Sequence, residues 1–140
     1  MDKRQCKAMC GGMGTSGTCA KFIFGEGDSD CEKIDFDEKE MLNIFDELNT
    51  AEKGDIITLG SPQLGLDEIT ELSEKLKGRS FKKRCMVFTP RIVKEQAKKL
   101  GYTNELERAG CEILSDCCTC LTPLINKDSV DAVTTNSIKG

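Results

Sequence analysis

The sequence contains no histidine, which removes the commonest general base and the commonest nitrogen ligand for metals. It also has no run of about 18 apolar residues, so no membrane span is predicted. The opening MDKRQCKAMCGGMG lacks the apolar centre of a signal peptide. Lys and Arg form no basic run with interleaved aromatic residues, which argues against nucleic-acid binding. We therefore expect an acidic cytoplasmic protein that binds neither membrane nor nucleic acid.

Cysteine, by contrast, is abundant. A chain of 140 residues can bury a core without disulfides, and nine cysteines in a cytoplasmic protein are better explained as buried thiols or ligands than as a disulfide framework. The count is odd, which also disfavours complete pairing. Three of the thiols fall within SDCCTCLTP, residues 115–123. The cysteines occupy positions 6, 10, 19, 31, 85, 111, 117, 118 and 120.

The chain divides by pattern near residue 36. Residues 1–36 contain the small-residue stretch GGMGTSGT and are expected to be irregular, whereas residues 37–140 read as an α/β domain. At the start of the second part, Asp37 can cap a helix, with Glu40 three residues later. Its apolar face is expected to pack on the core before Asn49 ends the helix. That face consists of Met41, Ile44, Phe45 and Leu48.

Short apolar runs alternate with helical patterns in residues 55–136. The runs are DIITLG, RCMVFT, CEIL and DAVTTN. A helix with acids in its first turn follows SPQLG and ends before Gly78, and a second begins after Thr89 as cap, with Pro90 at its first position, and stops at Gly101. A short helix is expected around Leu106 and Ala109. This alternation predicts an α/β fold with a mainly parallel sheet and flanking helices.

The segments that follow the strands are predicted to share one edge, because ligands of open parallel sheets bind outside the carboxyl ends of the strands. Hydroxyls, an amide, cations, a carboxylate and thiols would meet there from distant parts of the sequence. These segments are 61–63, 89–91, 116–120 and 136–137 together with Lys139.

The thiol segment leaves three interpretations open. Its spacing matches neither a zinc ribbon nor a bacterial ferredoxin, so a self-contained metal site is not expected. A cysteine at a strand end can simply pack as a small buried hydrophobe. Redox sensing by Cys117, Cys118 and Cys120 would require a lowered thiol pKa. In the third interpretation, one thiolate of this segment joins thiolates from other parts of the protein to bind a metal cluster.

Five stretches, in order, resemble the large-subunit or catalytic portion of the aconitase X family of iron–sulfur hydro-lyases. The resemblance implies a Rossmann-like, aconitase-type domain that is part of a longer large subunit. It also implies an iron–sulfur cluster, of the 4Fe-4S or 2Fe-2S kind. The stretches are CKAMCGGMGTSGT, DIITLGSPQLGLDEI, VFTPRIVKEQAKKLGY, AGCEILSDCCTCLTPL and VTTNSIKG.

By this resemblance, Cys118 falls on the cluster cysteine, with Cys117 and Cys120 as packing neighbours. Arg91 and Asn136 fall where anionic substrate groups could be bound, and Ser137 and Lys139 fall on the turn assigned to catalysis. The sequence departs from the family at three positions, so either the cluster is altered or it is absent. Ser61 replaces a cysteine ligand, Gln63 replaces a histidine, both at expected substrate-binding positions, and Ile138 replaces a glycine.

The resemblance implies elimination of water from a small hydroxy-carboxylate, together with a swivelling small subunit or domain that this chain lacks. We expect the isolated chain to be inactive alone. Known members dehydrate phosphorylated mevalonate or cis-3-hydroxyproline, and Ser61 favours the second. The alternative is a non-catalytic α/β binding or structural module whose cysteines are packed or redox-sensitive thiols.

Overall fold

The computed structural model describes residues 1–17, 19, 21–25, 27, 30, 32–126 and 128–137. Its centre is a four-stranded sheet in the order β3-β2-β1-β4, in which every neighbouring pair is parallel. The predicted α/β class and parallel sheet are therefore confirmed. The strands are β1 (Ile56–Leu59), β2 (Cys85–Thr89), β3 (Cys111–Ser115) and β4 (Val133–Thr135).

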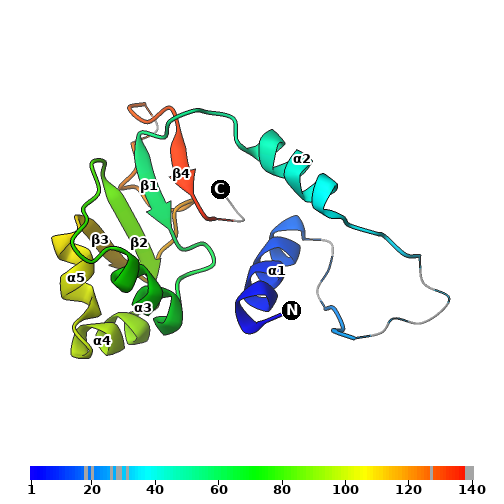
Figure 1. Ribbon diagram of the computed structural model, residues 1–140, viewed down its shortest axis with the longest axis horizontal. Helices are drawn as coiled ribbons and strands as arrows, with labels where there is room; N and C mark the ends of the chain where they lie inside the picture. Colours follow the sequence, from blue (N-terminus) through cyan, green and yellow to red (C-terminus); the bar gives the residue numbers. More distant parts are fainter. Residues whose placement is uncertain are drawn as a thin grey trace.

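Three helices form one layer beside the sheet (Figure 1). They are α3 (Leu66–Lys75), α4 (Arg91–Lys99) and α5 (Tyr102–Arg108). Alternate strand residues face this layer, and their apolar side chains join those of the helices in one core. Successive crossovers in one direction place consecutive helices on the same face, which explains the single layer. The core cluster consists of Leu64, Ile69, Cys85, Val87, Ala97, Leu106, Cys111 and Ile113.

On the face of the sheet opposite the helices, the segment between β3 and β4 is bonded to the residue before β2. Met86 and Phe88, which alternate with the helix-facing residues of β2, are both fully buried. Arg84 donates from Nη1 to the carbonyl oxygen of Leu124 at 2.9 Å and pairs with Glu112 through Nε at 2.7 Å. The central strand β2 is therefore buried on both faces, as its near-continuous apolar sequence requires, whereas β4 at the edge of the sheet is exposed.

The N-terminal helix α1 (Lys3–Ser16) corrects the expectation that this segment is irregular. Asp2 and Gln5 form a capping box, with Gln5 N donating to Asp2 Oδ1 and Asp2 N donating to Gln5 Oε1, both at 2.8 Å. Capping and the ion pairs to α3 described below offset the cost of the glycines in its second half. The proposed division of the chain at residue 36 stays a prediction.

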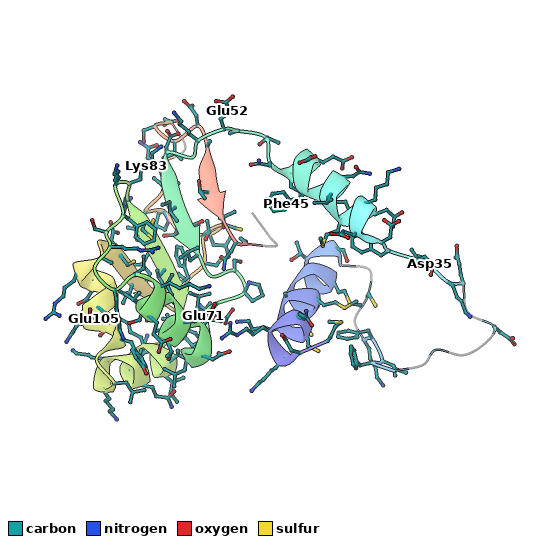
Figure 2. The ribbon with its side chains drawn as sticks, in the orientation of Figure 1. Asp35, Phe45, Glu52, Glu71, Lys83 and Glu105 are labelled. Atoms are coloured by element: carbon teal, nitrogen blue, oxygen red, sulfur yellow. The ribbon has the colours of Figure 1, made fainter. Side chains whose placement is uncertain are left out.

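The second helix, α2 (Glu38–Leu48), begins at the predicted capping box of Asp37 and Glu40 and ends at Asn49 as expected. Its apolar face, however, does not pack on the core. Phe45 is 68% exposed and Leu48 is 75% exposed, and Figure 2 shows Phe45 clear of the three-helix layer. The core-packing expectation is wrong for this chain, because periodicity predicts an apolar face and not what covers it.

No helix in the described part of the chain is long and apolar enough to cross a membrane.

The side chain of Asp55, just before β1, forms hydrogen bonds with the residues just before β4. Its Oδ2 accepts from the backbone N–H groups of Asp131, at 3.0 Å, and Ala132, at 3.1 Å. These donors, Ala132 first, hold the pKa of the Asp55 carboxyl below its ordinary value. A depressed pKa stabilises the fold above the ordinary carboxyl pKa, and this contribution is lost as pH falls through the folded value.

We therefore expect Asp55→Asn to lower the Tm by a few degrees at pH 7 and to have no effect once acid has protonated the native carboxyl. Thermal unfolding followed by circular dichroism from neutral to strongly acid pH measures this. Asp131→Asn is the matched control, because Asp131 contributes only its backbone N–H to the pair of bonds. A Tm difference for Asp55→Asn that persists unchanged in acid would contradict the assignment.

Candidate active site

The strand order places a topological switch point between β1 and β4. From β1 the chain moves to β2 and β3 on one side, and β4 then returns to the other side. In open α/β sheets this is where ligands bind, outside the carboxyl ends of the strands. The segments after β1 and β4, which contain Ser61, Asn136 and Ser137, flank this point.

Two hydrogen bonds join these segments across the switch point. Gly60 N donates to Asn136 Oδ1 at 2.9 Å, and Ser137 Oγ donates to the carbonyl oxygen of Ser61 at 3.1 Å. Ser61 itself is buried, with 4% exposure, and its peptide bond to Pro62 is cis. Residues 76 positions apart in sequence are thus held together.

The turn after β1 is also bonded to the thiol segment and to β2. Gln63 Nε2 donates to the carbonyl oxygen of Cys117 at 2.9 Å. Leu64 N donates to Phe88 O at 2.9 Å, and Thr89 Oγ1 donates to Leu64 O at 2.7 Å. The hydroxyl of Thr89 is therefore not the predicted helix cap. Pro90 occupies the N-cap position of α4, and the helix begins at Arg91.

Arg91 and Asp116 connect the start of α4 to the thiol segment after β3. Asp116 Oδ1 accepts from the backbone N–H of Arg91 at 3.1 Å, and Arg91 Nη2 lies 2.8 Å from Asp116 Oδ2. Asp116 has a φ of 58°, in the left-handed region that Asp tolerates better than most residues. The Arg91 side chain is 76% exposed, so its guanidinium is accessible at the rim.

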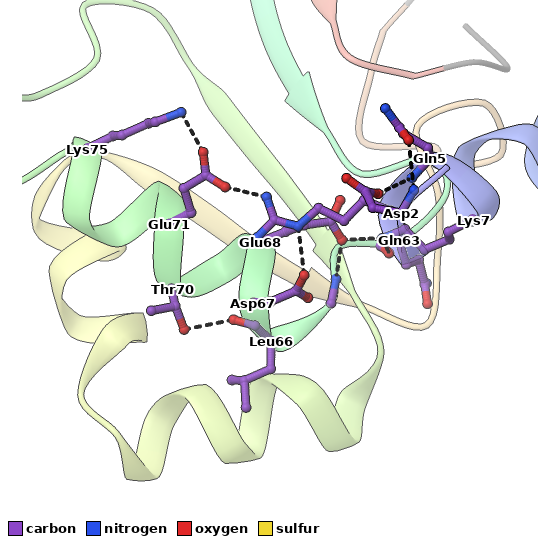
Figure 3. A network of polar contacts seen from close by, with 12 residues as sticks. Asp2, Gln5, Lys7, Gln63, Leu66, Asp67, Glu68, Thr70, Glu71 and Lys75 are labelled. Atoms are coloured by element: carbon purple, nitrogen blue, oxygen red, sulfur yellow. Dashed lines mark hydrogen bonds and ion pairs between the residues drawn. The ribbon is translucent and has the colours of Figure 1, made fainter.

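Helix α1 lies against this edge and supplies two cations that the sequence did not point to. Arg4 pairs with Asp67 through Nε at 2.7 Å and with Glu71, and Lys7 pairs with Glu68 and donates to Gln63 O at 3.1 Å (Figure 3). Lys75, first, and Arg4 lower the pKa of Glu71 to about 2.

An open depression of about 270 Å³ lies between α1 and the switch point. Pro62 and Asn136 line it from the sheet side, and Arg4 and Lys7 from α1. Only the acidic start of the α3 sequence could have indicated a basic partner for this helix. The partner's identity required the tertiary structure.

The three clustered thiols differ in their surroundings. Cys117 and Cys118 are half-buried and Cys120 is exposed. Burial, with added repulsion from Cys118 and Asp116, raises the pKa of the Cys117 thiol, so Cys117 is a poor source of thiolate. Within the described residues, no three side chains of Cys, Asp or Glu lie close enough together to hold a metal ion. The part of the chain that the structure describes therefore does not form a cluster site by itself, and a cluster held by Cys118 would need further ligands from outside those residues.

The contacts agree with the predicted meeting of the strand ends at one edge. They join four segments: the turn after β1, the start of α4, the thiol segment and the segment after β4. Gln63, Arg91, Asn136 and Ser137 are each engaged in a bond between two of these segments. Their roles toward a substrate, the role of Ser61, and that of Cys118 as a ligand stay predictions. Lys139 and Ile138 lie outside the described residues.

Comparison with known proteins connects this domain to one family. Residues 54–140 match the family described as aconitase X third domain. The phosphomevalonate dehydratase large subunit of Methanocaldococcus jannaschii is 32% identical over 66% of this chain and 23% of its own length. That of Methanosarcina mazei is 28% identical over 99% of this chain and 35% of its own length.

Two further similarities point the same way. The cis-3-hydroxy-L-proline dehydratase of Hypocrea jecorina is 33% identical over 77% of this chain and 19% of its own length. The crystal structure of Thermococcus kodakaraensis aconitase X superposes with a TM-score of 0.65 at 28% identity, over 73% of this chain and 27% of that chain. The chain thus spans about a quarter to a third of the length of the phosphomevalonate dehydratase large subunits it matches.

The matched region begins just before β1 and contains the whole sheet, the three-helix layer and the edge at which the strand ends meet. The chain therefore belongs to the aconitase X family, whose third domain it contains as residues 54–140.

Proposed function

We propose that this chain is part of an aconitase X-type hydro-lyase that eliminates water from a small hydroxy-carboxylate. The observation that supports this most is the switch-point edge, where four segments distant in sequence are bonded together within the region that matches the family. The relatives are named as dehydratases, and two of them as large subunits.

Removal of water from a hydroxy-carboxylate creates negative charge at two places, on the leaving oxygen and on the carbon that loses its proton. Preorganised cations and hydrogen-bond donors lower the barrier when they face those positions. In this chain the accessible guanidinium of Arg91 is suited to hold a carboxylate, and Asn136 and the buried backbone at Ser61 shape the adjoining rim. For Ser137 to move a proton, its hydroxyl must first leave Ser61 O.

The proposal includes two further components, an iron–sulfur cluster and a small subunit or domain. Cys118 would contribute one thiolate to an iron–sulfur cluster whose other ligands come from the rest of the enzyme. A small subunit or domain would close over the edge, which agrees with the lack of histidine as a general base here. The substrate is a phosphorylated mevalonate or a hydroxyproline, as the names of the relatives suggest.

The test is Cys118→Ala in the complete enzyme that contains this chain, large and small subunits together. We expect turnover of the accepted substrate, phosphomevalonate or cis-3-hydroxy-L-proline, to fall at least about tenfold and bound iron to fall with it. Circular dichroism should show an unchanged fold. Cys120→Ala, in the same segment but exposed, is the matched control and should keep both iron and turnover. Unchanged turnover and iron in Cys118→Ala would refute the role of this thiol.

The second candidate is a non-catalytic module, and one observation favours it. The polar side chains at the edge bind one another, as expected if they serve only to fasten loops. Arg91→Lys separates the candidates, because lysine keeps the charge and loses the planar fork. A catalytic edge predicts a raised KM for the carboxylate substrate, whereas a purely structural edge predicts a lowered Tm with unchanged KM.

A further inference from the structure

Two other cysteines, far from the thiol segment in sequence, form a pair in the core. Cys85 is the first residue of β2 and Cys111 the first residue of β3, and the two are direct partners in the parallel register. Their sulfur atoms lie 3.9 Å apart. Cys85 has no exposed surface and Cys111 is 5% exposed, and both belong to the helix-facing core cluster.

The backbone at this pair already suits a disulfide. Neighbouring strands lie about 4.8 Å apart, so register partners have a Cα separation inside the usual disulfide range. Both side chains point to the same face of the sheet, since both join the same cluster. Rotation about the Cα–Cβ bonds can therefore bring the sulfurs together without moving the strands.

The two thiols are also not equivalent. The hydrogen bond between the sulfurs raises the pKa of Cys85, and burial raises it further. The same bond lowers the pKa of Cys111. Cys111 is also the less buried of the two, at 5% exposure against none for Cys85, so its sulfur is the one that an oxidant meets first.

We propose that Cys85 and Cys111 are an oxidation site of this protein, at which hydrogen peroxide forms a reversible disulfide between β2 and β3. The Cys111 sulfur attacks one peroxide oxygen, the O–O bond breaks, and the departing hydroxide takes a proton to leave as water. Cys85 then attacks the resulting sulfenic acid, the S–O bond breaks and a second water departs. One peroxide is reduced and the two sulfurs are oxidised to one disulfide.

The site lies at the opposite end of the strands from the candidate active site. Arg84, which directly precedes Cys85, is exposed. Gly110, which directly precedes Cys111, lies in a turn where Phe81 N donates to Ala109 O at 2.9 Å. For peroxide to reach the sulfurs, this corner must open locally, which requires the bond between Phe81 N and Ala109 O to break. The disulfide closes the chain around α4 and α5, so it restricts the unfolded state and raises the Tm of the oxidised protein.

The experiment uses the folded 140-residue chain treated with hydrogen peroxide. Remaining thiols are alkylated under denaturing conditions, and the protein is cleaved with trypsin and a glutamate-specific protease. Cleavage after Glu112 separates Cys111 from the three clustered thiols, so the peptides of residues 85–91 and 109–112 report this bond alone. We expect these two peptides to be linked, at the mass of both less two hydrogen atoms, and to separate after reduction.

Matched variants identify the bond and its effect. Cys85→Ala and Cys111→Ala should each abolish the linked peptide and the peroxide-dependent rise in Tm, whereas Cys117→Ala should keep both. If an alanine variant does not fold, the peptide map of the unmodified chain still decides. The proposal is overturned if peroxide oxidises the exposed thiols while Cys85 and Cys111 remain free, or if their bond forms only in unfolded protein.

Discussion

Replacement of Gly60 by alanine is expected to lower the free energy of unfolding by about 2 to 4 kcal/mol. Gly60 has a φ of +105°, a region that residues with a side chain rarely adopt. A Cβ there would lie 2.3 Å from the carbonyl oxygen of Phe88, which is backbone in a buried strand and cannot move aside. Either the turn after β1 or the β1–β2 pairing must give way.

The same change should disturb the candidate active site, because Gly60 N is held by Asn136 and Leu64 N by Phe88 O. Urea unfolding followed by circular dichroism measures the stability loss. Gly78→Ala is the matched control, since Gly78 has a φ of +70° but no atom within 4 Å of the added Cβ. It should lose only about 1 to 2 kcal/mol, the cost of the left-handed backbone alone. Equal losses at the two positions would show that the contact with Phe88 O is unimportant.

Phe88→Ala is expected to lower the free energy of unfolding by about 3 to 5 kcal/mol, whereas Phe45→Ala should change it by less than about 0.5 kcal/mol. Phe88 is fully buried, so its removal leaves a cavity. Phe45 is 68% exposed on α2 and leaves none. Given a typical total stability of about 5 to 15 kcal/mol, the first loss is a large part of the whole.

The pair of variants also tests the structure of α2 directly. Sequence periodicity places Phe45 on an apolar face of the kind that packs on a core, so a core-packed α2 would make the two losses similar. Urea unfolding of the two variants beside the unmodified chain decides between these outcomes. A loss above about 2 kcal/mol in Phe45→Ala would show that α2 packs against the rest of the chain in solution.

The bonds at the switch point change how the predicted site residues should be interpreted. Asn136, Gln63 and Arg91 each carry a contact that holds the edge together. A substitution at any of them can therefore reduce activity by loosening the edge as well as by losing a substrate contact. Kinetic effects at these positions need a parallel measurement of stability.

The sequence alone determined the elements that depend on neighbours in the chain. Alternating apolar runs and helical faces predicted the parallel sheet, and the Asp37–Glu40 capping box predicted the start of α2. Parallel strands send their carboxyl ends to one edge, so the meeting of the segments after β1, β2, β3 and β4 also followed from topology. These signals are local in sequence or follow from chain direction.

Only the tertiary structure decided which side chain meets which. Helix α1 is held by ion pairs with α3, whose residues lie more than 60 positions away in sequence. The glycines of α1 are typical of a loop, so the local sequence pattern did not predict a helix there. Thr89, which was expected to cap a helix, instead donates its hydroxyl to Leu64 O. Cys85 lies beside Cys111 because the two are partners in the register of β2 and β3. Such contacts depend on packing between distant segments, which periodicity and spacing do not specify.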